Sequence, residues 1–220
     1  MNCLYAIYHD EFPEFIKQLE NSAALQRIDH IDMNCGVNYT SYPLFRDLQP
    51  YSRLQHSIGV ALIIYHFTHD TVQSLAGLMH DISTPAFSHT IDFMNGDYLK
   101  QESTEENTRI CIENDACISQ YLSTNKISIE DVCNYHIYPI ADNPSPQLSA
   151  DRLEYTLSNA LNYHFASKKE IAEIYTDITI GINEKCEEEL LFMHSEQAEC
   201  FAYLALRCGK VYVSQQDRFA

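Results

Sequence analysis

His80 and Asp81, near the middle of the chain, are the first residues whose types could do chemistry. They follow directly on residues 75–79, which are small or apolar and read Leu-Ala-Gly-Leu-Met. A buried helix is therefore expected to end by presenting an imidazole beside a carboxylate. In an apolar setting such a pair is costly unless each group is hydrogen-bonded or binds a metal. For an isolated His-Asp pair, a helix end with a solvated aspartate is the simpler interpretation.

Two more titratable residues follow a break at Ser83-Thr84-Pro85. His89 and Asp92 are three positions apart, so on a short helix they share a face. Residues 75–93 thus concentrate four titratable side chains, and we expect the rest of the chain to be organised around them.

The composition describes an acidic protein of ordinary domain size. With 220 residues the chain can bury a sizeable core as a single domain. Lys and Arg number 14 against 31 Asp and Glu, and the net charge of −17 argues against polymeric nucleic acid or an anionic membrane as a partner. The eight cysteines form no Cys-x-x-Cys pair and no signal peptide opens the chain, so we expect reduced thiols in a cytoplasmic protein.

The spacing of apolar residues predicts an all-α fold. Helices are expected over residues 11–27, 51–68, 72–80, 103–121, 129–135, 150–165, 168–180 and 186–207. Ser103-x-x-Glu106 has the form of a capping box, and Ser149 is a predicted N-cap. Loops are expected over residues 34–50 and 136–148, and a strand signal over residues 210–214. The chain ends without a polar tail, so the natural protein could continue beyond Ala220.

Two further segments complete a pattern that resembles a known family. Residues 51–60 read YSRLQHSIGV, and residues 147–155 read QLSADRLEY. His56, then His80-Asp81, then Asp151 is similar to the H…HD…D signature of the HD-domain superfamily of metal-dependent phosphohydrolases. The contexts RxxHSxGVA, HDxxxPxFSH and SADRLEY resemble its deoxynucleoside-triphosphate triphosphohydrolase branch over residues 27–160. The resemblance implies one HD-type helical domain over residues 1–220, with C-terminal helices over residues 168–209.

The resemblance also implies a metal site between helices. Its ligands would be His56, His80, Asp81 and Asp151. Two imidazoles and two carboxylates suit one divalent transition metal, namely Mn, Fe, Co, Ni or Zn. Such a metal lowers the pKa of bound water and polarises a phosphoryl oxygen. Between the HD pair and Asp151 the chain offers only His89 and His136 as further histidines, so we expect a mononuclear site.

The same resemblance assigns a catalytic pair. His89 and Asp92 match the family's catalytic histidine and acid, with Asp92 fixing the tautomer of His89 and raising its basicity. The alternative interpretation of His89 and Asp92 is an exposed polar pair on a helix. His69-Asp70 is a second literal His-Asp pair, but it lacks the extended context and is expected to lie on the surface. His136 is either a pocket-lining residue or a structural loop histidine.

Three residues are predicted to bind substrate. Arg53, one turn before His56, is expected to clamp a phosphate. Arg152 is a second candidate for that task, with a surface salt bridge as its alternative. Tyr155 matches a sugar contact of the triphosphohydrolases, and an ordinary core tyrosine fits it equally well.

Some positions depart from the family pattern. Ser83-Thr84 stands where the family often has Gly-His, and Gln101-Glu102 stands where we expect another active-site histidine. Asn159 occupies the sugar-contacting position one turn past Tyr155. These departures weaken the prediction of triphosphate specificity more than that of phosphoester or phosphoanhydride hydrolysis.

The sequence therefore predicts a metal-dependent phosphohydrolase for a nucleotide or a similar small phosphorylated metabolite, acting through a metal-activated water. A phosphatase or phosphodiesterase of nucleoside monophosphates, alarmones or cyclic nucleotides is the neighbouring alternative. A degenerate nucleotide-binding regulatory module that keeps the metal is an alternative of a different class. The sequence leaves open whether the protein forms a homo-oligomer.

Overall fold

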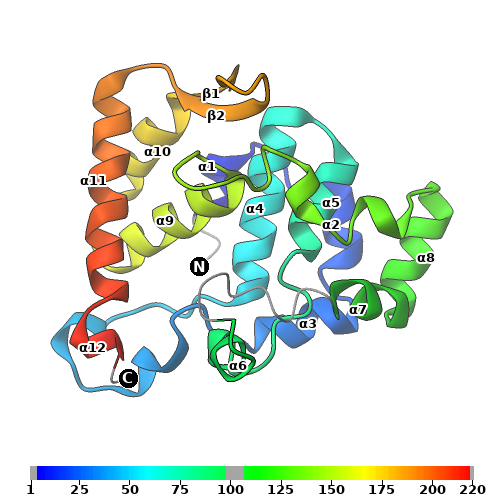
Figure 1. Cartoon of the computed structure of the whole chain (residues 1–220), viewed down its shortest axis with the longest axis horizontal. Coiled ribbons are helices and arrows are strands. Elements are labelled where there is room, and N and C mark those ends of the chain that lie inside the picture. The colour runs from blue at the N-terminus through cyan, green and yellow to red at the C-terminus, as the bar shows by residue number, and fades with distance from the viewer. Residues whose placement is uncertain (1–3, 98–106, 219–220) are drawn as a thin grey trace.

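The computed structural model describes residues 4–97 and 107–218, and most of these are helical (Figure 1), which confirms the predicted all-α class. The α-helices and strands are, in chain order, α1 (Tyr5–Tyr8), α2 (Glu14–Leu19), α3 (Ala23–Asp29), α4 (Arg53–Thr68), α5 (Thr71–Met79), α6 (His89–Met94), α7 (Thr108–Asn114), α8 (Ala116–Asn125), α9 (Ala150–Asn162), α10 (Lys168–Thr176), β1 (Ile178–Ile182), β2 (Glu188–Phe192), α11 (Ser195–Tyr212) and α12 (Gln215–Arg218). Short 3₁₀ turns cover Cys35–Tyr39, Pro43–Phe45, Ile129–Asp131 and Tyr135–Ile137.

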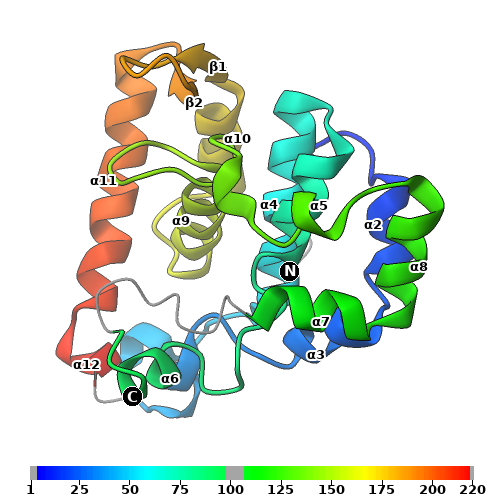
Figure 2. The same cartoon turned by 45° about the vertical axis from the view of Figure 1, so that its right-hand side comes forward.

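Helix α4 is the central element of the fold. From Arg53 to Ile64 every residue except Gln55 is buried. A helix that is apolar on nearly all sides lies in a core, and α1, α3, α5 and α9 pack against α4. Figures 1 and 2 show α4 and α5 in the middle, with α9, α10 and α11 on one side and α2, α3, α7 and α8 on the other.

Capping residues define both ends of α4 and the start of α5. Ser52 and Gln55 form a capping box at the start of α4. His69 ends α4 in the left-handed conformation with φ 52°, and the Asp70 side chain then accepts the backbone N–H groups of Val72 and Gln73. The second His-Asp pair is thus a helix junction with an exposed imidazole, as predicted. The junction turns α5 back along α4, which brings His80 beside His56.

Gly77 permits the close approach of α4 and α5. A Cβ atom at this position would collide with Ile64 Cδ1 and lie 3.2 Å from Val60 Cγ1. Both neighbours are fully buried, so neither can move into solvent. The glycine in the middle of α5 therefore serves packing, at the expense of helix propensity.

Gly77→Ala is expected to lower the free energy of unfolding by about 1–3 kcal/mol, because the added methyl overpacks this contact. The matched control is Gly209→Ala in α11, where a Cβ atom meets nothing within 4 Å. That substitution is expected to raise stability by up to about 1 kcal/mol through helix propensity. Urea unfolding of both variants measures the difference, and equal stabilities would contradict the packing argument.

Several predicted elements are wrong in detail near the C-terminus. Residues 178–182 and 188–192 form an antiparallel hairpin, with Ile178 opposite Phe192 and Ile180 opposite Leu190, although residues 178–180 and 188–192 were expected to be helical. The β-branched residues of β1 favour a strand once they can pair locally. The predicted strand over residues 210–214 falls largely in α11, because Leu204, Cys208 and Val211 recur at helical spacing and are buried.

Other predicted helices are divided. The helix expected over residues 11–27 is split into α2 and α3, and Ser22 has extended backbone angles between them. Asp115 separates α7 from α8 and caps α8. The helix expected over residues 129–135 consists of 3₁₀ turns. The predicted Ser103–Glu106 capping box lies outside the described residues. Within residues 4–97 and 107–218, no helix combines the length and the apolar character that a membrane span requires.

Candidate metal centre

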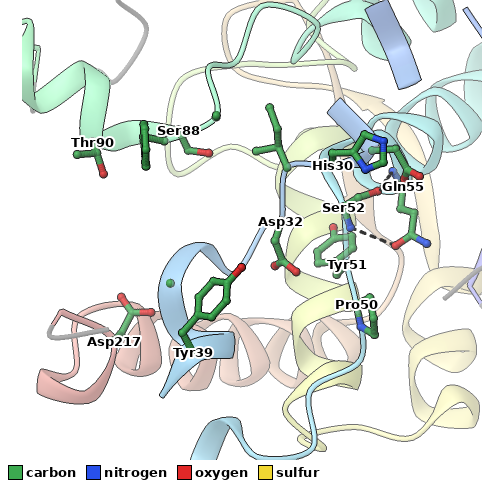
Figure 3. A pocket seen from close by; sticks show the side chains of 15 residues that line it. His30, Asp32, Tyr39, Pro50, Tyr51, Ser52, Gln55, Ser88, Thr90 and Asp217 are labelled. Carbon is green, nitrogen blue, oxygen red and sulfur yellow. Dashed lines mark hydrogen bonds between the residues drawn. The ribbon is translucent and has the colours of Figure 1, made fainter. Parts of the chain in front are cut away.

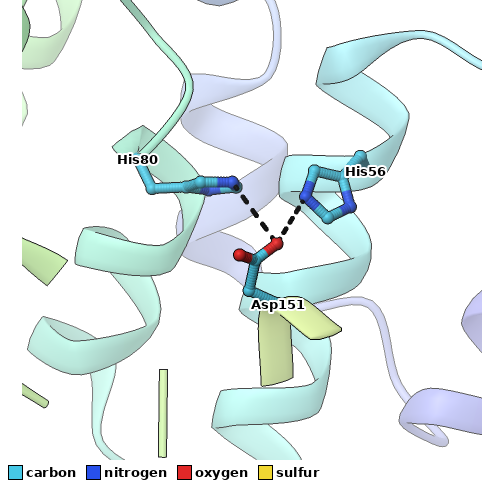
Figure 4. A group of neighbouring side chains, drawn as sticks. All are labelled: His56, His80 and Asp151. Atoms are coloured by element: carbon cyan, nitrogen blue, oxygen red, sulfur yellow. Dashed lines mark ion pairs between the residues drawn. The ribbon is translucent and has the colours of Figure 1, made fainter. Parts of the chain in front are cut away.

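Three of the predicted ligands converge from three different helices. His56 lies in α4, His80 directly follows α5, and Asp151 lies in the first turn of α9. Asp151 Oδ1 is 2.9 Å from His56 Nε2 and 4.0 Å from His80 Nε2 (Figure 4). All three ligand atoms lie within 4.8 Å of one another. In the described part of the chain, no other group of three or more His, Cys, Asp or Glu residues has this spacing.

The start of α9 fixes Asp151. Ser149 caps the helix by accepting the backbone N–H of Arg152, as predicted. The preceding loop is tied to the same turn, since Ala150 N–H donates to Ile140 O and Asp151 N–H donates to Ala141 O. The carboxylate is therefore held at a helix N-terminus, where negative charge is favoured.

The outer nitrogens of the two histidines are both engaged. His80 Nδ1–H donates to Gly77 O at 2.7 Å, and His56 Nδ1 lies 2.6 Å from Glu154 Oε2. A carbonyl oxygen can only accept, so the proton of a neutral His80 lies on Nδ1 and its Nε2 carries a lone pair. Metal-ligating histidines normally use a carboxylate or a backbone carbonyl in this way. The donor set therefore fits a divalent transition metal held by His56, His80 and Asp151.

Glu154 is a site residue that the sequence reasoning missed. The residue is 1% exposed, and besides its contact with His56 its carboxylate accepts hydrogen bonds from Tyr51 OH and, at 2.6 Å, from Ser158 Oγ. Gly59 makes room for it, because a Cβ there would lie 2.6 Å from Glu154 Cγ. The available signal was its position three residues after Asp151, which places both carboxylates on one face of α9.

The two carboxylates control the protonation of His56. Burial lowers the pKa of His56, but hydrogen bonds to Asp151 and Glu154 outweigh it and raise that pKa to about 10. Burial raises the pKa of Asp151, but the hydrogen bond from His56 and the charges of His56 and His80 outweigh it and lower that pKa. The carboxylates of Asp151 and Glu154 thus favour a positive charge at His56, and Asp151 provides the negative charge next to its Nε2 atom.

Glu154→Gln is expected to weaken metal binding roughly 10–100-fold, the usual effect of losing an outer partner of a ligating histidine. An amide offers His56 Nδ1 no negative charge, and its NH₂ group can donate to Nδ1 and force the imidazole proton onto Nε2. Titration against a competing chelator measures the affinity. Ser158→Ala is the matched control: it removes one hydrogen bond to Glu154 and keeps the carboxylate, so its effect should be smaller. Wild-type affinity in Glu154→Gln would contradict the assignment.

Asp81, the fourth predicted ligand, lies beside this group. Its Oδ2 is 3.6 Å from His80 Nε2, and both of its oxygens accept from Arg53 Nη1, at 2.9 and 2.8 Å. Thr84 Oγ1 donates to Oδ1 at 2.9 Å. Burial raises the pKa of Asp81, but the charges of Arg53, His80 and His56 outweigh it and hold that pKa well below its usual range. Direct ligation of a metal by Asp81 stays a prediction.

The three residues predicted to bind substrate differ in their burial and in their partners within the protein. The Arg53 side chain is 7% exposed and pairs with Asp81. Arg152 donates to Asn143 Oδ1 at 2.6 Å, to Gln147 O at 2.8 Å and to Asn143 O, so it organises the loop before α9. Tyr155 is half-buried on α9, and burial raises its pKa. Their contacts with a substrate stay predictions.

The predicted catalytic pair lies in α6. Asp92 is 2% exposed, whereas the side chain of His89 lies outside the part of the chain that the structure describes, so their pairing stays a prediction. His136 reaches toward the centre through aromatic contacts. Its ring lies 4.3 Å from that of Tyr135, which lies 5.0 Å from that of His80, and its Nδ1 is 2.7 Å from Asp142 Oδ2.

A pocket of about 840 Å³ opens next to the start of α4 (Figure 3). This volume is in the range of small-molecule sites. Its lining carries carboxylates at Asp29, Asp32 and Asp217. Tyr51 also lines the pocket, and its hydroxyl lies 3.3 Å from His56 Nδ1. Tyr51 is therefore shared by the pocket wall and the hydrogen-bond network of the centre.

Comparison with known proteins finds distant relatives. No protein-family model matches the chain. The chain is similar to the metal-dependent phosphohydrolase cns2 of Cordyceps militaris, with 29% identity over 168 residues, which covers 71% of this chain and 44% of that protein. It is also 27% identical over 149 residues to the uncharacterized protein YdhJ of Bacillus subtilis, which covers 67% of this chain and 44% of that protein. The chain thus spans less than half the length of either relative.

Proposed function

We propose that this chain is an HD-type metal-dependent phosphohydrolase for a nucleotide or a similar small phosphorylated metabolite. The observation that carries the proposal is the convergence of His56, His80 and Asp151, with the outer nitrogen of each histidine held by an acceptor. The relative named a metal-dependent phosphohydrolase supports the same class of reaction.

The chemistry divides between the metal and the chain. When bound by His56, His80 and Asp151, a divalent transition metal would polarise a phosphoryl oxygen and lower the pKa of bound water. Glu154 and the Gly77 carbonyl orient the two imidazoles, and Arg53 holds Asp81 beside them. His89 is proposed to transfer a proton to or from the reacting oxygen, with Asp92 as its partner.

The lining of the pocket supports a substrate that carries hydroxyl or amino groups in addition to phosphate. The carboxylates of Asp29, Asp32 and Asp217 repel phosphate but accept hydrogen bonds from hydroxyl and amino groups. A phosphate near the metal centre and a sugar or base in the pocket is therefore the arrangement that we propose. Membership of the deoxynucleoside-triphosphate triphosphohydrolase-like branch that the motifs resemble is part of this proposal, whereas triphosphate specificity is left out of it because of the departures at Ser83-Thr84 and Gln101-Glu102.

A metal and substrate screen tests the function. Protein reconstituted with Mn, Fe, Co, Ni or Zn is incubated with nucleoside mono-, di- and triphosphates, cyclic nucleotides and alarmones, and the released product is identified. Release of phosphate, pyrophosphate or triphosphate identifies the bond that is cleaved. Nucleotide binding without turnover of any compound would favour the regulatory module instead.

His89→Ala is expected to keep the fold and the bound metal while lowering kcat by about a hundredfold or more, as the loss of a positioned general acid or base does. Asp92→Asn should cause part of this loss, because it disturbs the tautomer of His89 and leaves the ring in place. Steady-state kinetics on the best substrate and elemental analysis of the same samples provide the measurement. Unchanged turnover in His89→Ala with the metal bound would reject the pair.

A further inference from the structure

Three histidines gather where the end of α1 meets the end of α4, away from the metal centre. They are His9, His66 and His69, and we call them the surface histidine cluster. The ring centroid of His9 lies 5.7 Å from that of His66 and 6.4 Å from that of His69. His66 and His69 are exposed, and His9 is partly buried. His66 follows His56 by ten residues in the same helix, which corresponds to about 15 Å along its axis.

One pair of rings in this cluster is spaced like the two histidines of the metal centre, whereas the ligand atoms of the three surface histidines do not all lie within 4.8 Å of one another as the side chains stand. His56 and His80 have ring centroids 5.1 Å apart with an interplanar angle of 78°, and His9 and His66 are 5.7 Å apart at 79°. Imidazoles that share one metal ion must approach to about this distance. The surface rings pack edge to face, and rotation about χ2, which is a soft torsion for histidine, can turn the exposed nitrogens toward His9.

His9 offers a ligand atom without a competing partner. Its Nδ1 is buried and has no hydrogen-bond partner among residues 4–97 and 107–218. Burial lowers the pKa of His9 and His66, and the charges of neighbouring histidines lower both further. Neutral imidazoles are the form that binds metal. The adjacent carboxylates of Asp10 and Glu11 add negative charge that favours a cation.

We propose that His9, His66 and His69 form a second metal site, which binds Zn²⁺, Ni²⁺ or Cu²⁺ independently of the metal centre. Imidazole ligands favour these ions over Mg²⁺ or Ca²⁺. With three protein ligands, the site keeps a position for solvent. The ion would join the segment after α1 to the end of α4, so its binding should raise the thermal stability of the protein. Aromatic packing around Tyr65, which contacts both His9 and His69, is the competing explanation for the cluster.

Calorimetric titration with Ni²⁺ tests the site in protein that already holds its metal at His56, His80 and Asp151. The wild type is expected to take up one further equivalent, with an upward shift of Tm. His69→Asn should lose both effects. His164→Asn is the matched control, because His164 is also exposed and also has a positive φ, 57° against 52° for His69, a conformation that Asn tolerates.

Two more variants complete the test. His66→Gln should lose the same equivalent, which covers the case in which His69→Asn does not fold. Asp151→Ala should keep the uptake at the surface cluster, whether or not the proposed phosphohydrolase activity exists. The second site is overturned if the wild type binds no further Ni²⁺, if His69→Asn and His66→Gln bind as much as the wild type, or if His164→Asn loses the equivalent as well.

Discussion

Asp151→Ala is expected to abolish metal retention and turnover together. Asp151 Oδ1 is the atom that faces both His56 Nε2 and His80 Nε2, so its removal leaves two imidazoles without the negative charge that completes the set. Losing a ligand from a small set removes most of the binding free energy. Elemental analysis after gentle purification should find close to one metal per chain in the parent and none in the variant.

The comparison is best made in the His69→Asn background, so that the surface cluster does not contribute to the count. Asp142→Asn serves as the control for metal content, since Asp142 lies near the centre but pairs with His136 and Arg152. Circular dichroism establishes that both variants fold. A full metal content in Asp151→Ala would reject the centre, and two equivalents in this background would reject a mononuclear site.

Arg53→Ala should lower the free energy of unfolding by about 3–5 kcal/mol, a large part of the stability of an ordinary domain. The Arg53 and Asp81 side chains are only 7% and 13% exposed, so the substitution leaves a carboxylate in the interior without its main countercharge. Because the pKa of Asp81 is lowered in the folded protein, the pair stabilises the fold above about pH 4 and loses this effect as the pH falls further. Urea unfolding at neutral and acidic pH measures both effects.

A double-mutant cycle separates this role from the predicted phosphate clamp. Removing Asp81 as well, in Arg53→Ala/Asp81→Ala, should recover part of the lost stability, because no unpaired charge then remains. Arg53→Lys keeps a charge but loses the planar guanidinium, so it should be intermediate in stability. If Arg53→Ala has wild-type stability and only KM for the phosphorylated substrate rises, the residue acts on substrate instead.

The sequence predicted the elements whose local signals agree with their packing. Ser149 is an N-cap in sequence and in structure, and the helix expected over residues 51–68 corresponds to α4 (Arg53–Thr68). His56, His80 and Asp151 were identified because their contexts are specific, and the fold brings them together. Glu154 was missed because a glutamate on a helix is ordinary in sequence, and only the packing of α9 against Gly59 shows that it is buried.

The hairpin β1–β2 and the partners of Arg53 could not be predicted, because both depend on contacts between separate segments of the chain. A five-residue strand such as β1 depends on pairing with β2, and helical periodicity in the flanking segments obscures it. Because Arg53 lies one turn before His56, the sequence placed both side chains on the same face of α4. Whether that face presents Arg53 to a ligand or to Asp81 depends on α5, whose approach depends on Gly77.

The close contact between Gly59 and Glu154 has an evolutionary consequence. Because a single added carbon at position 59 would collide with the Glu154 side chain, the two positions cannot vary independently. Among related chains that keep His56 and His80, we expect an alanine or serine at position 59 only where position 154 carries a side chain shorter than glutamate. A mutational path between such sequences must therefore shorten residue 154 before it enlarges residue 59, and the reverse order passes through an intermediate in which His56 is misplaced.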